Sequence, residues 1–158
     1  MLKNSFLSIV IPVYNEAGSI RNLFEEIINI CNNEDYAFEV IIVDDGSTDG
    51  TSEIIKQLSP LIYIRLRRNF GQTAALDCGI KKAGGDFVIT IDGDGQNDPA
   101  DIPKLLHHLQ EKDLDIVSGW RKSRKDPFLK KITSRIANIL RLFILHDGLH
   151  DSGCTLKI

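Results

Sequence analysis

The sequence predicts an α/β fold with three layers, in which helices cover both faces of a mostly parallel sheet. Short apolar, β-rich runs alternate along the chain with amphipathic helical patterns. The runs are almost continuously apolar, which is typical of parallel strands buried on both faces. The 158 residues are 42% hydrophobic and 26% charged, and this balance suits one globular unit. We therefore expect a single domain over residues 1–158.

Five strands are expected where the apolar runs occur. The first, "LSIVIPVY", is broken by Pro12 near its end. The expected strands cover residues 7–14, 38–45, 61–66, 86–92 and 114–120. The final "CTLKI" reads as the beginning of a sixth strand, so we expect the domain to be truncated at its C-terminus.

Helices are expected between these strands. The first has apolar residues along one face and Ser19 as a plausible N-cap. A later helix should end at Gly84 and Gly85, since glycines commonly terminate helices. The expected helices cover residues 19–31, 51–58, 72–83, 102–109 and 128–145.

The unusual polar residues follow the expected strands. Open parallel sheets bind their ligands at the carboxyl ends of the strands. The residues at these ends are Pro12, Tyr14 and Glu16 after the first strand, Asp44 and Asp45 after the second, Asp92 and Asp94 after the fourth, and Arg121 after the fifth. One edge of the sheet should therefore carry the site.

The segment Asp92-Gly93-Asp94, with Gln96 close behind, offers hard oxygen ligands. Such ligands suit Mg²⁺ or Mn²⁺ held jointly by protein and substrate phosphates. Gly93 would let the backbone approach a ligand closely. The alternative is an Asp/Gly turn that caps the helix beginning at Asp98-Pro99.

Three further segments have both a binding and a structural interpretation. Asp45 suits a nucleobase edge or ribose hydroxyls, because a carboxylate accepts two donors well; Tyr14 could stack on a base, and Glu16 could accept from base or ribose. Residues 67–69 could form a wall of the same site. The structural alternative for all three segments is ordinary turns and helix caps.

Positive charge is concentrated late in the chain. Residues 1–120 carry a formal charge of −9, whereas residues 121–158 carry +6. Such a segment indicates an anionic partner, although a solvated helix face is an alternative. Arg121 suits a diphosphate, because its planar guanidinium matches phosphate oxygens, and Arg135 could add a second contact.

Taken together, these motifs resemble family 2 glycosyltransferases with the GT-A (Rossmann-like) fold, in the branch of dolichyl- and polyprenyl-phosphate mannosyl- or glucosyltransferases. The motifs occur in the family's order over nearly the whole chain: "IPVYNE", "VDDGSTDGT", "RRNFGQTAAL", "ITIDGDGQNDPADIP", "VSGWRKSRKDPFLKKITSRIAN" and "HDSGCTLK".

The resemblance implies roles for individual residues. The nucleotide pocket would be lined by Pro12, Tyr14, Glu16, Val43 and Asp45. Asp92, Gly93 and Asp94 match the Asp-Xaa-Asp motif that contacts the nucleotide sugar and the metal, and Gln96 matches a metal ligand. Arg121 and Arg135 match cations that meet the donor diphosphate or the acceptor phosphate. Alanine is common in this branch where Gly93 stands, and glycine should be tolerated there because the backbone makes the contact.

The resemblance further implies inverting transfer of a hexose from a nucleotide diphosphate sugar, of the GDP-mannose or UDP-glucose type, to a polyprenyl or dolichyl phosphate. Asp94 and Arg121 would act on the donor, with Mg²⁺ or Mn²⁺ as cofactor. Asp151 is a candidate base or acceptor-orienting residue, and a turn residue is its alternative.

The partners expected are the donor, the lipid-linked phosphate and a membrane surface met by the basic segment 121–141, with no nucleic acid. A homo-oligomer stays open. No apolar run approaches the roughly 20 residues needed to cross a bilayer, and the three cysteines are scattered. We therefore expect a cytoplasmic protein, peripheral to the cytoplasmic face of the membrane.

Three alternatives remain at this point. A phosphoacceptor receiver domain shares the α/β pattern and an early acid pair, but it lacks a second acidic site. A nucleotidyltransferase usually has a Gly-rich loop ending in Lys or Arg near its N-terminus, and "IPVYNEAGSIR" is not one. A chain that binds nucleotide sugar without turnover is the third.

Overall fold

The computed structural model describes residues 5–119 and 154–158. Its sheet contains four parallel strands in the order β3-β2-β1-β4. The strands are β1 (Phe6–Val13), β2 (Ala37–Asp44), β3 (Ile62–Arg65) and β4 (Phe87–Thr90). The helices are α1 (Ile20–Asn33), α2 (Thr51–Ile55), α3 (Gln72–Lys82), the 3-10 helix η2 (Pro99–Asp101) and α4 (Ile102–Glu111). The predicted α/β class is confirmed, and every one of these strands was expected from its apolar run.

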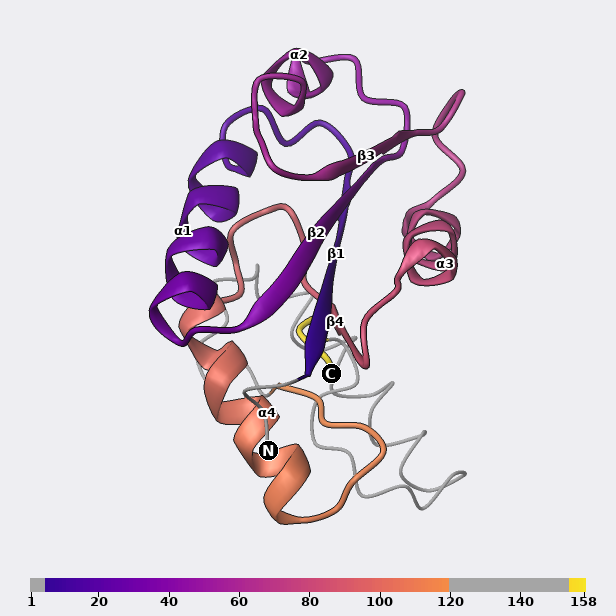
Figure 1. Cartoon of the computed structure of the whole chain (residues 1–158). Coiled ribbons are helices and arrows are strands. Elements are labelled where there is room, and N and C mark those ends of the chain that lie inside the picture. The colour runs from indigo at the N-terminus through magenta and orange to yellow at the C-terminus, as the bar shows by residue number, and fades with distance from the viewer. Residues whose placement is uncertain (1–4, 120–153) are drawn as a thin grey trace, which may run out of the picture.

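Helices cover both faces of the sheet, which gives the predicted three layers (Figure 1). Successive side chains of β1 point to opposite faces. Ile9 and Ile11 join the larger core with the apolar faces of α1 and α4, whereas Val10 joins a smaller core under α3. All three side chains are fully buried. This burial on both faces explains why β1 is apolar at every position except Ser8.

The strand order determines where the sheet has a crevice that can bind a ligand. The chain adds β2 and β3 on one side of β1 and then returns to add β4 on the other side. The order therefore reverses between β1 and β4, and in open α/β sheets ligands bind in the crevice at such a point. The carboxyl ends of β1, β2 and β4 meet there.

The segment expected as a fifth strand differs from the prediction. Within the described part of 114–120, only Ser118 forms a bridge, and its partner is Lys157 in antiparallel orientation. Lys157 also bridges Thr90 of β4 in antiparallel orientation, so residues 156–158 lie between β4 and residues 117–119. An apolar run alone could not reveal that a distant segment would pair between these two.

Two helix ends lie where the sequence predicts them but differ in detail. Ser19 is at the N-cap position of α1, but its hydroxyl makes no capping bond to the helix. The helix α3 ends at Lys82 with Ala83 as its C-cap, immediately before the glycines that were expected to terminate it. The predicted helix 128–145 lies outside the described residues.

Within the described residues, none of the helices has the length and apolar character needed to cross a bilayer.

Candidate functional site

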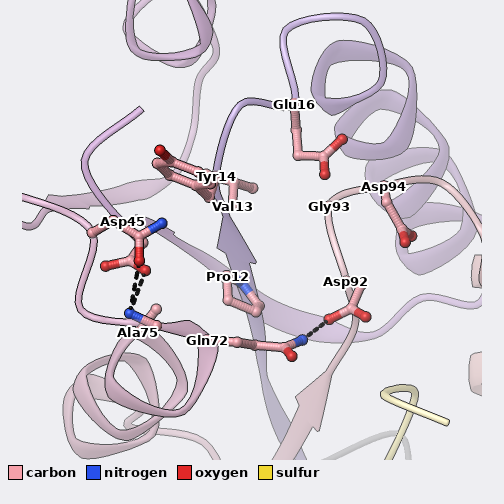
Figure 2. Close-up of a pocket in the computed structure, with 12 residues that line it drawn as sticks. Pro12, Val13, Tyr14, Glu16, Asp45, Gln72, Ala75, Asp92, Gly93 and Asp94 are labelled. Atoms are coloured by element: carbon pink, nitrogen blue, oxygen red, sulfur yellow. Dashed lines mark hydrogen bonds between the residues drawn. The ribbon is translucent and has the colours of Figure 1, made fainter. Parts of the chain in front are cut away.

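A pocket of about 340 Å³ opens at the switch point between β1 and β4. Its volume is within the range usual for small-molecule sites. Figure 2 shows Tyr14 and Asp45 on one side and Asp92, Gly93 and Asp94 on the other, with Pro12 between them. The lining residues are Pro12, Val13, Tyr14, Glu16, Asp45, Asn69, Gly71, Gln72, Ala75, Asp92, Gly93 and Asp94. The loops after three strands therefore build one site, together with the start of α3.

The loop after β1 is fastened to the loop after β2 by reciprocal hydrogen bonds. The backbone N–H of Asn15 donates to Oγ of Ser47 at 3.0 Å, and the N–H of Thr48 donates to Oδ1 of Asn15 at 2.8 Å. One residue on, the N–H of Glu16 donates to Oγ1 of Thr51 at 2.8 Å. Asn15 has a φ of 58°, a conformation that asparagine tolerates better than most residues. These bonds fix the backbone that presents Tyr14 and Glu16 to the pocket.

The adjacent acids Asp44 and Asp45 have different tasks. Asp44 is fully buried and accepts bonds from the Ser47 N–H, the Ser52 hydroxyl and the Tyr63 hydroxyl. Burial alone would raise the pKa of Asp44, but these hydrogen bonds outweigh it and hold the pKa below its ordinary value. Asp44 is therefore an ionised residue with a structural role, and its hydrogen bonds stabilise the turn after β2.

Asp45 faces the pocket and also fixes its far wall. Its two carboxylate oxygens accept from the backbone N–H groups of Phe70 and Gly71, each at 2.8 Å. Gly46, which follows it, has a φ of +77°, and a Cβ there would lie 2.6 Å from the backbone carbon of Arg68. Only glycine lets the two loops approach this closely. Asp45 thus joins the end of β2 to the loop that begins α3.

The loop after β4 is held from the start of α1. The hydroxyl of Ser19 lies 2.7 Å from the carbonyl oxygen of Gly93, to which it can donate. The same hydroxyl also lies 3.0 Å from Oε2 of Glu16. The Ser19 hydroxyl therefore contacts the Asp-Gly-Asp loop and Glu16, and it accepts no capping bond from the first turn of its own helix.

Negative charge accumulates on this side of the pocket. Burial raises the pKa of Glu16, the Ser19 hydroxyl partly opposes this, and repulsion from Asp94, Asp49 and Asp92 raises it further. A cation would relieve this repulsion. Asp92 and Asp94 supply carboxylate oxygens, so the residues present fit Mg²⁺ or Mn²⁺.

No three His, Cys, Asp or Glu side chains within the described ranges are arranged to hold a metal ion. An ion here would take its remaining ligands from water and from donor phosphates, as Mg²⁺ commonly does.

Most of the predicted donor-site residues meet in this pocket. Those that line it are Pro12, Tyr14, Glu16, Asp45, Asp92, Gly93 and Asp94. Arg121, Arg135 and Asp151 lie outside the described residues.

Val43 and Gln96 are not among the residues that line this pocket. The side chain of Val43 is fully buried in the smaller core with Val10, because it points to the face that α3 covers. The backbone N–H of Gln96 donates to Oδ1 of Asp94, but the residue lines a separate hollow beside α1. Its expected role as a metal ligand stays a prediction.

Four of the lining residues did not stand out in the sequence: Val13, Gly71, Gln72 and Ala75. Asn69 was expected as part of a wall and lines the pocket, whereas Arg67 and Arg68 line a separate hollow with Phe70. The available signal was the polar "NFGQ" between an expected strand and helix, on the same edge as the acids.

Residues 8–157 match the family model described as Glycosyl transferase family 2. The chain belongs to this family. Because the chain is a family 2 glycosyltransferase, the receiver-domain and nucleotidyltransferase interpretations no longer apply.

The names of two curated relatives of this family 2 chain each include a polyprenyl phosphate. A dodecaprenyl-phosphate galacturonate synthase of Rhizobium johnstonii is 45% identical, with 96% of this chain and 47% of the relative covered. An undecaprenyl-phosphate 4-deoxy-4-formamido-L-arabinose transferase of Pseudomonas savastanoi pv. phaseolicola is 39% identical, with 96% and 46% covered. The chain spans about half the length of the curated relatives it matches.

Solved structures show the same GT-A fold. Glucosyl-3-phosphoglycerate synthase of M. tuberculosis matches with a TM-score of 0.76 at 21% identity, over 99% of this chain and 58% of that chain. The mannosyltransferase PcManGT of Pyrobaculum calidifontis, solved with GDP-Man and Mn²⁺, matches with a TM-score of 0.59 at 26% identity, over 75% and 36%.

Proposed function

We propose that this chain is the donor-binding and catalytic part of an inverting glycosyltransferase that moves a sugar from a nucleotide diphosphate sugar to a polyprenyl phosphate. The observation that carries the proposal is one pocket that combines an exposed aromatic ring, Asp45 and the acidic loop Asp92–Asp94. The two relatives named above carry different sugars in their names but share a polyprenyl phosphate. The two names therefore support a polyprenyl phosphate acceptor more strongly than they support any one sugar.

In this proposal the nucleoside lies over the ends of β1 and β2. Tyr14 is 43% exposed and lines the pocket, so its ring is available for stacking on a base. Asp45 already accepts two backbone donors, and each carboxylate oxygen has a second lone pair for a base or ribose donor. Glu16 is a further acceptor toward the ribose.

The diphosphate would lie toward the loop after β4. Asp92 and Asp94 would hold Mg²⁺ or Mn²⁺, in keeping with the Mn²⁺ named for PcManGT. Such an ion, when bound, neutralises the charge that develops on the departing diphosphate. Arg121 would add a fixed positive charge for the same phosphates.

The acceptor needs positioning more than activation. A phosphate monoester has a second pKa of about 6, so at neutral pH it is already largely an anion that can attack. Arg121 and Arg135 would bring it to the donor sugar, and Asp151 would orient it or accept a proton. If Asp151→Asn transferred sugar at the unsubstituted rate, Asp151 would have no such role.

The sugar was expected to be a hexose from a donor of the GDP-mannose or UDP-glucose type. Neither relative's name contains mannose or glucose; one names galacturonate and the other a formamido arabinose. We therefore propose a donor whose sugar carries a polar substituent such as a carboxylate or formamido group. The acceptor would be met at a membrane surface, through the basic segment 121–141 on its cytoplasmic side.

Calorimetric titration tests the donor site. UDP, GDP and their sugar conjugates would be titrated with Mn²⁺ and again with EDTA, against the unsubstituted protein and Asp94→Asn. We expect one nucleotide family to bind more tightly with Mn²⁺ than in EDTA, and we expect Asp94→Asn to abolish that gain. No binding of any nucleotide would contradict the proposal. Binding without transfer to a polyprenyl phosphate would leave a nucleotide-sugar-binding module in its place.

A further inference from the structure

Gln72 links the two halves of the pocket. It is the first residue of α3, and its Nε2 donates to Oδ1 of Asp92 at the end of β4 (Figure 2). Gln72 is exposed, so the bond crosses the mouth of the pocket rather than its floor. The bond joins two elements that are 20 residues apart in sequence.

The position of Gln72 is set from the opposite side of the pocket. Asp45 holds the backbone N–H of Gly71, the residue immediately before Gln72, at 2.8 Å. Gly71 has a φ of +97°, a conformation that glycine adopts readily and that turns the chain into α3. A continuous series of contacts therefore runs from Asp45 through Gly71 and Gln72 to Asp92.

The helix that carries Gln72 is fixed against the sheet. Ala75 is fully buried in the smaller core. Gly79 packs so closely that a Cβ there would lie 2.4 Å from Cγ1 of Val10. Because α3 has so little freedom to shift or rotate, the amide of Gln72 is presented to Asp92 in one defined place.

We propose that Gln72 is a positioning residue that orients the Asp92 carboxylate for the divalent ion and couples it to the nucleotide end of the pocket at Asp45. A neutral amide suits this task, since it fixes one carboxylate oxygen without cancelling the negative charge that attracts a cation. Hydrogen-bonded partners of metal ligands commonly change metal affinity 10–100-fold when they are removed. The inference rests on the proposed function, because it assumes a metal at Asp92.

The test measures Mn²⁺ binding directly, by the loss of the free-ion electron paramagnetic resonance signal, with and without the nucleoside diphosphate that the unsubstituted protein binds. Gln72→Met removes the amide and keeps the shape of the side chain, and Gln72→Ala removes both. Gln57→Ala is the matched control, because it removes an exposed amide that bonds Arg21 away from the pocket. Nucleotide binding in EDTA and the thermal midpoint are measured for each variant.

We expect both Gln72 variants to bind Mn²⁺ about 10–100-fold more weakly, with metal-free nucleotide binding and the thermal midpoint close to those of Gln57→Ala. If Gln72→Met binds Mn²⁺ like Gln57→Ala, the inference is wrong and the proposed function stands. Equal loss of metal-bound and metal-free nucleotide binding would also overturn it, since that indicates a general disturbance of the pocket. If the unsubstituted protein binds neither Mn²⁺ nor nucleotide, the proposed function itself fails.

Discussion

Val13 and Gly93 pack so closely at the ends of β1 and β4 that a Cβ atom on Gly93 would lie 2.6 Å from Cγ1 of Val13. Val13 is 3% exposed and belongs to the larger core, so it has little room to withdraw. The family resemblance indicated that alanine is common where Gly93 stands. In this chain Val13 makes glycine the residue that fits.

We expect Gly93→Ala to destabilise the protein by about 1–3 kcal/mol, the usual cost of an added methyl in a well-packed place. The measurement is the free energy of unfolding from urea denaturation. Gly84→Ala is the control, because the nearest atom to a Cβ there is Oε1 of Glu39 at an ordinary 3.6 Å. Val13→Ala should relieve the clash, so the double variant should be more stable than the sum of the two single changes predicts. Strictly additive effects would show that the two residues do not compete for space.

The buried carboxylate of Asp44 should make stability depend on pH. Its pKa in the folded protein is lowered from 3.8, so its ionisation contributes stability above that value. That contribution is lost as the pH falls through the folded-state pKa. Asp44→Asn lacks this titration and leaves buried donors poorly matched, which should cost about 1–3 kcal/mol at pH 7.

Chemical denaturation at several pH values would check this expectation. The stability difference between the unsubstituted protein and Asp44→Asn should be largest near neutral pH and should shrink below about pH 4. Asp77→Asn serves as control, because Asp77 is exposed and forms an ion pair with Lys81 on the surface of α3. A difference that stayed constant down to pH 2 would rule out Asp44 as the titrating group.

Tyr14 offers a clean test of stacking, since its exposed ring contributes little to the core. We expect Tyr14→Ala to lose about 1–3 kcal/mol of nucleotide affinity, the usual value of base–aromatic stacking, while Tyr14→Phe stays close to the unsubstituted protein. Calorimetry with the preferred nucleoside diphosphate gives the affinities, and thermal melting should show no change. Equal losses in Phe and Ala variants would indicate that the hydroxyl, not the ring, makes the contact.

The basic segment 121–141 should bind anionic membranes. Each Lys or Arg near such a surface is worth about 1 kcal/mol, so sedimentation with anionic vesicles should fall steeply as salt rises. Reversing Arg121 and Arg135 to Glu should weaken sedimentation, whereas the same change at Lys81 and Lys82 of α3 should not. Binding that is insensitive to salt, or equal on zwitterionic vesicles, would contradict the electrostatic account.

The sequence could predict the parts of the site that depend on local pattern. Apolar runs identified β1 to β4, and acids directly after two of these strands identified the edge of the sheet. The sequence also favoured Asp45 over Asp44 as the acid that faces a ligand. The reason appears only in the structure, where Asp44 is fully buried and bonded to Ser47, Ser52 and Tyr63.

The remaining features depend on contacts between distant segments. Ser19 looked like a helix cap, but its hydroxyl makes no capping bond and instead lies 2.7 Å from the carbonyl oxygen of Gly93, 74 residues away. Val43 and Gln96 belong to the motifs but do not line the pocket. The register of β2 directs the Val43 side chain into the core, and the turn after Asp94 decides where Gln96 lies. Gln72 resembled an ordinary first residue of a helix, because nothing local shows which side chain faces it across the pocket.

Under the proposed function Asp45 both contacts the donor and holds the loop at Phe70 and Gly71, and this limits how the donor preference could be redesigned. A substitution intended to accept another base would at the same time release the loop at Phe70 and Gly71, and with it the start of α3. Libraries that vary this position alone would thus be dominated by misfolded pockets. Randomising the exposed Tyr14 while keeping the aspartate would leave these bonds intact and explore nucleobase selectivity separately.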